Sequence, residues 1–358
     1  KAEPLVEFLR SALPGAARLA LVETCVGHVE LLAQQILGEH SAVVVQGSYA
    51  QGLALRASDL DVAVIEDTKA GGAPARPAAP GVVDRHRALV CLRRLAAALA
   101  AADLPELRVA TRVFTARVPV LKLSFSSKAD SATGGGSENL DVDVSVGGSL
   151  TRGACDRCVH ALLRRDTSGL AAALCRLVKL WAKRRRLTDT LRGGLGNFGF
   201  VLLVVFFLQT LPRGGDFPES LRLPALQAIA GANLAAMAKG GRGGCPQQLR
   251  DAPSQRGTGE PLLPALLAAF FEWATEALPE LRAQKLAVSV AAAAPRPRGA
   301  GEDAFGKPLV VEVPLAPGEN AARCLRADVW ERVVAPELQR AQRLAGRLAE
   351  RRGAGPKA

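Results

Sequence analysis

Apolar residues recur every three or four positions over residues 4–38, with an interruption around Pro14 and Gly15. This spacing is typical of helices that bury one face, and a Pro-Gly pair ends regular structure. The pattern therefore predicts two helices at the start of the chain.

Strand-like patterns dominate the next hundred residues. β-Branched and alternating apolar runs predict five strands, at residues 42–45, 59–65, 108–114, 117–125 and 139–146. Helical spacing with an Arg-rich face predicts a helix over 84–102. Stretches rich in Gly, Pro, Ala and Ser predict loops at 70–81 and 129–138. We expect these elements to form an α/β unit.

The pattern becomes helical from about residue 150. Apolar spacing predicts helices near 156–165, 168–186, 195–211, 222–237 and 260–278, and a basic helix at 328–352. Stretches rich in Gly, Pro and Ala at 239–260 and 291–306 predict irregular structure, and a short strand is expected at 309–313. Two domains are therefore expected: one with the sheet at 40–147, and a helical one from 1–39 and 148–358.

Charge and cysteine usage limit the class of protein. The 46 Lys and Arg residues outnumber the 34 Asp and Glu residues, and the net charge of +12 favours a polyanionic partner, nucleic acid before membrane. Seven cysteines in a chain too large for a disulfide scaffold favour a reducing, intracellular compartment. The longest apolar stretch, 198–208, is too short to span a bilayer, so no membrane partner is expected. Because no signal peptide is visible and the chain starts at Lys1, we expect it to derive from a longer protein.

Two pairs of aspartates lie in predicted strands. Asp59 and Asp61 follow a Gly-Ser turn and begin one strand, and Asp141 and Asp143 belong to another. Since strand side chains alternate between faces, the members of each pair point the same way. Carboxylates on one face repel one another unless a cation lies between them, which predicts a hard divalent ion, Mg²⁺ or Mn²⁺. The alternative is that these residues cap turns and face water.

Several motifs, in order, resemble one family. QGSYAQGLALRASDLDVAVI looks like the signature of polymerase β-like nucleotidyltransferases, a hydrophobic-Gly-Gly/Ser turn followed by alternating aspartates, and DVDVSV looks like the strand of their third carboxylate. More narrowly, the chain resembles the noncanonical poly(A) polymerases and terminal uridylyltransferases, also called DNA polymerase sigma. The segments LCRLVKLWAKRRRL, PLLPALLAAFFEW and VVEVPLAPGENAARCL extend the resemblance to most of residues 4–350.

The resemblance implies an α+β fold: a nucleotidyltransferase domain with a mixed sheet, a mostly helical domain associated with poly(A) polymerases, and a cleft between them. It implies that Asp59, Asp61 and Asp143 bind two metal ions, with Asp143 rather than Asp141 matching the family position because it directly precedes Val-Ser. One ion would activate the attacking hydroxyl and the other would clamp the triphosphate and pyrophosphate.

The resemblance also implies nucleotide-binding residues. Gly47 and Ser48 would hold the triphosphate, and Lys179 and Lys183, four apart on one helix, would reach its β and γ phosphates. An ordinary solvated basic face is the alternative for the two lysines. The remaining assignments are Asn197 and Phe198 at the usual Ser-Tyr position, where the ring stacks on the base or joins the core, and Asn320 and Arg323 in the base-recognition motif.

Departures from the family pattern bear on the choice of nucleotide. Arg152-Gly153-Ala154-Cys155 replaces the usual Asn-Thr that contacts the ribose, and Glu312-Val313-Pro314 replaces the usual Glu-Asp-Pro. Uridylyltransferases of the family commonly carry a His before the recognition Asn, whereas Glu319 stands here, and Gly193-Gly194-Leu195 looks closer to the nuclear surveillance poly(A) polymerases. Both features favour ATP, with UTP or another nucleotide as the alternative. We expect a nuclear location, with the cytoplasm as the alternative.

The expected activity is template-independent transfer of AMP from ATP to an RNA 3′ end, with an RNA-binding protein as a possible partner. The alternatives are a terminal uridylyltransferase, a small-molecule nucleotidyltransferase and an inactive RNA-binding scaffold. Three further hypotheses are a zinc site at Cys155, Cys158 and His160, which lacks a fourth ligand, RNA contact by the Gly-Arg run at 240–244, and RNA guidance by Arg340, Arg343, Arg347 and Arg351.

Overall fold

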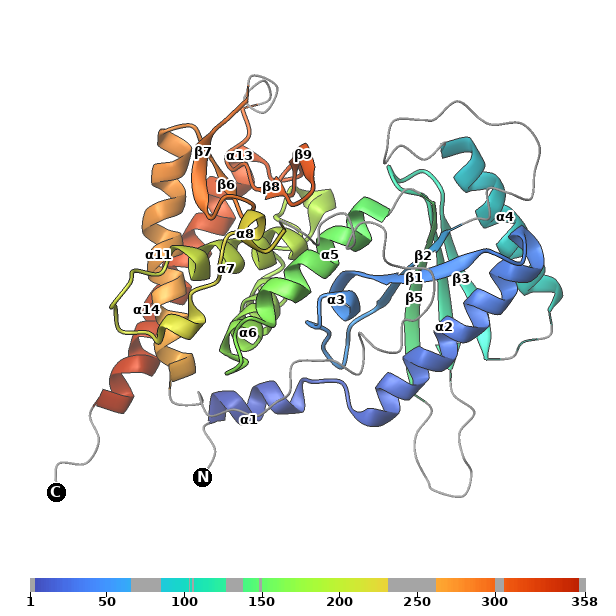
Figure 1. Cartoon of the computed structure of the whole chain (residues 1–358), viewed down its shortest axis with the longest axis horizontal. Helices are drawn as coiled ribbons and strands as arrows, with labels where there is room; N and C mark the ends of the chain where they lie inside the picture. Colours follow the sequence, from blue (N-terminus) through green and yellow to red (C-terminus); the bar gives the residue numbers. More distant parts are fainter. Residues whose placement is uncertain are drawn as a thin grey trace. The chain divides into compact units, whose positions relative to one another are not determined.

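The computed structural model describes residues 4–65, 85–102, 104, 106–126, 138–147, 150–230, 262–299 and 306–353. The predicted loop at 70–81, most of the loop at 129–138, the insert at 239–260 and the Gly-Arg run lie outside these residues. The chain forms two compact units, a sheet unit built on residues 12–157 and a helical unit built on residues 1–11, 158–234 and 253–358 (Figure 1).

The sheet unit contains a five-stranded mixed sheet. Its strands are β1 (Ala42–Gln46), β2 (Leu60–Ile65), β3 (Leu107–Val113), β4 (Val120–Ser126) and β5 (Asn139–Val146), in the spatial order β1-β2-β5-β4-β3. The β2–β5 pair is parallel and the other neighbours are antiparallel. The predicted α+β fold with a mixed sheet is confirmed.

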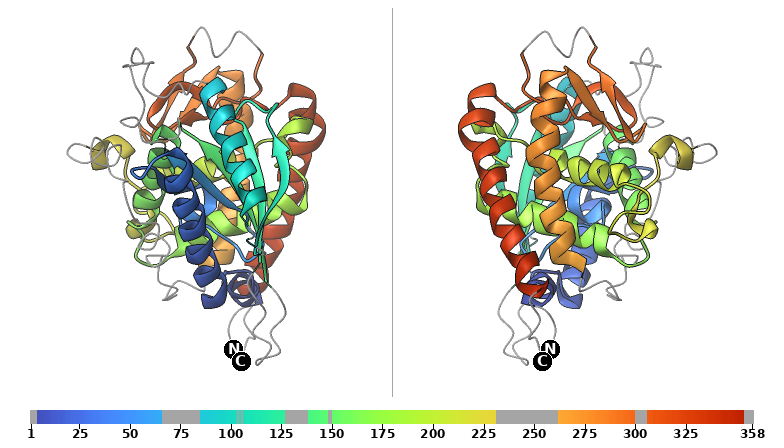
Figure 2. Two further views of the ribbon diagram at one scale, coloured as in Figure 1. Left: turned by 90° about the vertical axis from the view of Figure 1, so that its right-hand side faces the viewer. Right: turned by 90° about the vertical axis from the view of Figure 1, so that its left-hand side faces the viewer.

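Two helices cover one face of this sheet, α2 (Ala16–Leu37) and α4 (Arg85–Ala101) (Figure 2, left). Apolar residues of both helices join the alternate apolar residues of the strands in one buried core. This face takes every second side chain of each strand, so the intervening polar residues belong to the opposite face. The sheet therefore separates a core face from a polar face.

The boundaries of the units differ from the expected domains. The predicted break near Pro14 and Gly15 is present, but only α1 (Pro4–Ser11) belongs to the helical unit, where it packs against α6. The expectation that residues 1–39 belong to the helical domain was wrong for α2, because its wide apolar surface packs on β1 and β2. The second boundary falls inside α5 (Leu150–Leu163), between residues 157 and 158.

The helical unit packs around α7 (Asn197–Thr210), which is buried on every side after its first turn. Its other main helices are α6 (Leu170–Arg184), α8 (Leu226–Ala230), α11 (Leu263–Ala283) and α14 (Ala335–Gly353). Helices α11 and α14 run side by side (Figure 2, right), and Trp181, Phe200 and Phe271 pack edge to face between α6, α7 and α11. Short helical turns are η1 (Thr190–Arg192), η2 (Glu219–Leu221), α13 (Ala327–Val329) and the π-helical η4 (Trp330–Val334).

Two small hairpins complete the helical unit. They consist of β6 (Leu286–Ser289) with β7 (Ala294–Pro297), and β8 (Glu312–Val313) with β9 (Ala316–Asn320). The expectation of irregular structure at 291–306 was wrong for β7, whose Pro and Ala residues are tolerated because the strand pairs on one side only. Among the described residues, no helix has the length and apolarity needed to cross a membrane.

Candidate active site

The polar face of the sheet carries a row of functional side chains across four strands. Asp61 on β2 lies directly opposite Asp143 on β5, and Asp143 lies opposite Lys122 on β4. Gln46 of β1 continues the row beyond Asp61. Because β2 and β5 are parallel and in this register, two of the three predicted metal ligands lie on adjacent strands at the same level.

Lys122 holds the third carboxylate. Its Nζ donates to both Oδ1 and Oδ2 of Asp143 at 2.8 Å, and the side chains are 44% and 20% exposed. The hydrogen bond to Asp143 raises the pKa of Lys122, burial opposes that rise, and the negative charges of Asp143, Asp59 and Asp61 add to it. One ammonium group thus interacts with all three predicted carboxylates.

We expect Lys122→Met to lower the Tm of the metal-free protein, because three carboxylates then lose a cation that interacts with each of them. Mg²⁺ should raise the Tm of the variant by more than it raises that of the wild type. Differential scanning fluorimetry with EDTA or with Mg²⁺ measures both effects. Lys122→Arg, which keeps the charge, serves as the control, and equal Mg²⁺ responses in the Met variant and the wild type would contradict the assignment.

The same contact predicts a pH dependence. A lysine whose pKa is raised in the folded state stabilises the fold fully below its ordinary pKa of 10.5, and the stabilisation is lost as the pH rises through the folded value. The Tm difference between wild type and Lys122→Met should therefore stay constant around neutral pH and shrink only above 10.5.

The carboxylates fit a divalent cation. Asp59 is exposed just before β2, and Asp61 and Asp143 are half-buried. All are hard oxygen donors of the kind that Mg²⁺ prefers, and the contact with Lys122 shows that positive charge is accommodated among them. Among the described residues, no three His, Cys, Asp or Glu side chains are close enough to form a ready-made metal site. Metal binding by this set stays a prediction.

The turn after β1 is a short helix, α3 (Gly47–Ala50), that lies against Asp61. Gly47 has φ +63°, and a Cβ built on it would lie 2.2 Å from Asp61 Oδ2. Only glycine fits both the left-handed backbone and this close approach. The predicted Gly-Ser turn thus meets the predicted metal ligand, although the Gly47 N–H donates to Asp156 Oδ2 at 2.8 Å. Ser48 is half-buried in the same turn.

A buried arginine of α2 forms hydrogen bonds with the backbone at or just before the start of two strands. Arg18 is 6% exposed and donates to the carbonyls of Asn139, at the start of β5, and Ser58, the neighbour of Asp59. Burial raises the pKa of Tyr49 on α3, and the nearby Arg18 guanidinium opposes that rise. One guanidinium therefore connects the segments that carry Asp59 and Asp143 and lies close to the Gly-Ser turn, a role that the sequence did not reveal.

The predicted phosphate-binding lysines differ in their surroundings. Lys179 is only 7% exposed in the middle of α6, while Lys183, one turn later, is exposed. Arg176, one turn before Lys179, is also buried, and burial lowers its pKa to about 10. A buried cationic face on α6 is unlike a solvated basic helix, which favours the anion-binding interpretation for Lys179 over Lys183.

Asn197 and Phe198 open α7. Asn197 is exposed and Phe198 is half-buried, whereas every residue from 199 to 209 is buried. Phe198 therefore lies at the edge of the core, which leaves part of its ring accessible for stacking. The two residues and Lys179 belong to the helical unit, and the carboxylates belong to the sheet unit.

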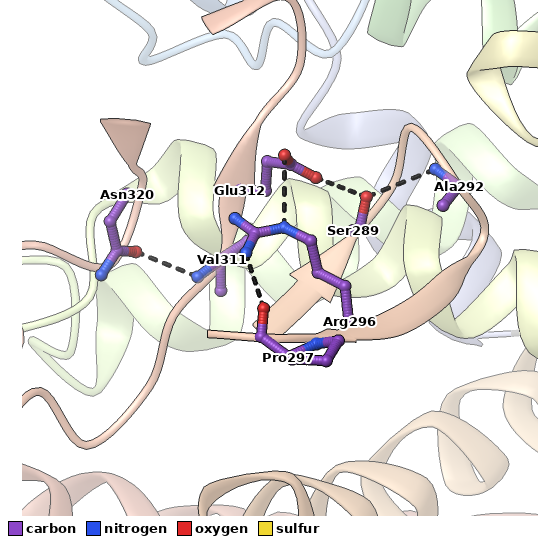
Figure 3. A network of polar contacts seen from close by, with 7 residues as sticks. All are labelled: Ser289, Ala292, Arg296, Pro297, Val311, Glu312 and Asn320. Atoms are coloured by element: carbon purple, nitrogen blue, oxygen red, sulfur yellow. Dashed lines mark hydrogen bonds and ion pairs between the residues drawn. The ribbon is translucent and has the colours of Figure 1, made fainter. Parts of the chain in front are cut away.

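The recognition motif lies in a network of polar contacts around the two hairpins (Figure 3). Asn320 Oδ1 accepts the N–H groups of Val311 and Ala322 at 3.0 and 2.7 Å, and its Nδ2 donates to the Leu309 carbonyl at 3.2 Å. The Asn320 amide is thus committed to the backbone and orders the motif. The Arg323 side chain is about half-exposed, and its Nη1 lies 3.9 Å from Glu319 Oε2.

Glu312 joins the hairpins by its side chain. It accepts a hydrogen bond from Ser289 Oγ on β6, and its Oε1 lies 3.4 Å from Arg296 Nε on β7 (Figure 3). Its carboxylate is 16% exposed. The first residue of the Glu-Val-Pro sequence therefore anchors the hairpins, and Arg296 is a partner that sequence reasoning missed because β7 was expected to be irregular.

We expect Asn320→Ala to destabilise the protein by about 2–4 kcal/mol, since two N–H groups and one carbonyl lose their partner in a half-buried place. Arg323→Ala should change stability by no more than about 0.5 kcal/mol, because its ion pair with Glu319 is long and exposed. Urea unfolding of both variants measures the difference. Equal stability of the two variants would show that Asn320 does not order the motif.

The proposed zinc site is not supported. Cys155, Cys158 and His160 all lie on α5, where both thiols are buried. No cluster of His, Cys, Asp or Glu suited to a metal is found within the described ranges. Three residues apart, the two thiols share one face of α5, and both are buried by helix packing, so the spacing alone was misleading. Arg340, Arg343 and Arg347 are exposed on α14.

Comparison with known proteins agrees with this geometry. Residues 2–152 match the family model for the central palm domain of mitochondrial-like poly(A) RNA polymerase. The terminal uridylyltransferase cid1 of Schizosaccharomyces pombe is 28% identical over 189 residues, which cover 52% of this chain and 39% of that protein. The chain therefore spans well under half the length of this curated relative.

Solved structures share the fold across both units. A crystal structure of the Cid1 poly(U) polymerase with MgGTP covers 96% of this chain and 93% of its own, with TM-score 0.65 and 18% identity. A structure of mtPAP in complex with UTP covers 97% of this chain and 68% of its own, with TM-score 0.62 and 17% identity. The Gly-Ser turn and the facing carboxylates lie within residues 2–152, so this part of the chain is similar to the palm domain of mitochondrial-like poly(A) RNA polymerase, and the chain shares its fold with Cid1 and mtPAP.

Proposed function

We propose that this protein is a template-independent RNA 3′-terminal nucleotidyltransferase that adds AMP from ATP. The observation that carries the proposal is the register of β2 and β5, which places Asp61 opposite Asp143 and beside the Gly47 turn. The carboxylates lie next to a turn whose backbone N–H and hydroxyl groups can donate to phosphate. This combination suits phosphoryl transfer, in which catalysis is mainly positioning and charge stabilisation.

In the proposed mechanism, Asp59, Asp61 and Asp143 would hold divalent ions, and the chain positions the reactants. Bound Mg²⁺ would supply charge neutralisation at the triphosphate and at the attacking hydroxyl. The RNA 3′ oxygen attacks the α-phosphorus in line, the bond to the α–β bridging oxygen breaks, and pyrophosphate leaves. An Asp143 carboxylate oxygen accepts or organises the hydroxyl proton, while the turn at Gly47 and Ser48 and the Lys179 ammonium orient the triphosphate.

The preference for ATP rests on the recognition motif. Glu319 stands where uridylyltransferases of the family commonly carry His, and a carboxylate there does not supply the same donor. Cid1 is named a uridylyltransferase, so addition of UMP is the second candidate. RNA is the proposed acceptor on the basis of the net charge of +12, and we propose a nuclear location and an RNA-binding protein partner.

Extension of a labelled oligoadenylate RNA tests the nucleotide preference. The four nucleoside triphosphates are supplied separately with Mg²⁺ or Mn²⁺, and Asp61→Ala serves as the inactive control. We expect a ladder with ATP that the control lacks. A stronger ladder with UTP would assign the protein to the uridylyltransferases, and ATP binding without any ladder would favour the inactive scaffold or a missing partner.

A further inference from the structure

Helix α5 presents two residues to the end of β1, Gly153 and Asp156. They lie three residues apart and therefore share one face of the helix. A Cβ on Gly153 would lie 3.5 Å from Val44 Cγ1 and 3.9 Å from Gln46 Nε2, so the helix lies against the strand at that point. This close approach brings Asp156, one turn later, to Gly47.

The Asp156 carboxylate holds both ends of the α3 turn. Its Oδ2 accepts the Gly47 N–H at 2.8 Å, and its Oδ1 accepts from Gln51 Nε2 at 2.6 Å. Asp156 and Gln51 are 2% and 4% exposed. A carboxylate this buried is maintained only where hydrogen bonds replace its hydration. Asp156 thus fixes the first residue of the turn and the residue that follows its last.

Gly47 is held from two sides. Its N–H meets Asp156, and its Cα lies so close to the Asp61 carboxylate that no Cβ fits between them. A shift of the turn toward or away from β2 would break the first contact or compress the second. Ser48, the next residue, therefore cannot move without a change in the position of Asp61.

We propose that Asp156 is a positioning residue that presets the Gly47–Ala50 turn to bind the triphosphate of the incoming nucleotide. This proposal rests on the proposed function, which assigns Gly47 and Ser48 to the triphosphate. Asp156 is buried behind the turn and acts through it. A turn that is already ordered binds a polyanion without a further loss of conformational entropy. Removal of the Asp156 carboxylate should therefore weaken nucleotide binding.

Three variants separate positioning from ordinary stabilisation. Asp156→Ala removes both acceptors, whereas Asp156→Asn can accept from Gly47 and donate to Gln51 once that amide turns over. Asp166→Ala is the matched control: Asp166 is 3% exposed and accepts the N–H groups of Ser168 and Ala171 at 2.9 and 2.7 Å in the helical unit. It should lower the Tm without touching the turn.

Two measurements are made on each full-length variant. Hydrogen exchange of the peptide that contains Gly47, without nucleotide or metal, reports the order of the turn whatever the protein binds. Calorimetric titration with a non-hydrolysable ATP analogue and Mg²⁺ reports triphosphate affinity. We expect Asp156→Ala to speed exchange of this peptide and weaken affinity by about tenfold or more, Asp156→Asn to restore most of both, and Asp166→Ala to change neither.

An unchanged hydrogen-exchange rate of the Gly47 peptide in Asp156→Ala would overturn the claim that Asp156 orders the turn. Faster hydrogen exchange together with wild-type affinity for the ATP analogue would overturn the claim that the ordered turn promotes triphosphate binding. If the wild type itself binds no nucleoside triphosphate, the proposed function fails and the triphosphate link fails with it, while the exchange result still decides whether Asp156 orders the turn.

Discussion

Asp143→Asn should reduce nucleotidyl transfer by about a thousandfold or more, because it removes one charge from the carboxylates that face each other across β2 and β5. The substitution keeps the size of the side chain, so the fold should be retained. Initial rates of RNA extension, measured with matched protein concentrations and circular dichroism spectra, give the size of the loss.

Asp141→Asn is the matched control for this prediction. Asp141 lies two residues earlier on the same strand and the same face, is exposed, and lies opposite Ser124 rather than Lys122. Its substitution should leave the rate within about twofold of the wild type, since exposed substitutions away from the site have small effects. If Asp141→Asn lost activity and Asp143→Asn kept it, the assignment of the third carboxylate would be wrong.

Gly47→Ala should abolish nucleotide transfer and also lower stability. The new Cβ would meet Asp61 Oδ2 at 2.2 Å, so either the turn or the carboxylate must move, and the φ of +63° adds about 1–2 kcal/mol of backbone strain. Extension assays and urea unfolding of the same preparation measure both effects.

Gly214→Ala separates strain from collision. Gly214 has φ +69°, but a Cβ on it would meet no atom within 4 Å. Gly214→Ala should therefore show the strain cost in urea unfolding and keep wild-type transfer. Equal activity of the two glycine variants would mean that the contact between Gly47 and Asp61 is not needed for transfer.

Local patterns predicted most of the elements. The five strands and the break near Pro14 follow from alternation and from the loss of helix-forming residues, which are properties of short segments. The assignment of α2 to the wrong domain has a different cause: its apolar surface is visible in the sequence, but the surface that it packs against is set by tertiary contacts.

The candidate site was predicted in part, because some of its signals are local in the sequence and others depend on tertiary contacts. The spacing of Asp59 and Asp61 and the Gly-Ser turn are local signals, whereas Lys122 acts through the register of β4 against β5, which a single strand does not reveal. Asp156 stands between the two cysteines that suggested a metal site, and it is this residue that accepts the Gly47 N–H. Lys122 lies between two buried leucines and Asp156 follows two buried small residues, so in both cases a charged side chain in an apolar stretch was the available signal.

The mass of the RNA product tests the central claim most directly. A defined RNA with a free 3′ hydroxyl, and the same RNA with a blocked 3′ end, are incubated with the protein, ATP and Mg²⁺. We expect that only the free RNA gains successive AMP units, and that the Asp143→Asn variant adds none. An unchanged RNA mass with wild-type protein under all nucleotides, or equal products from wild type and Asp143→Asn, would contradict it.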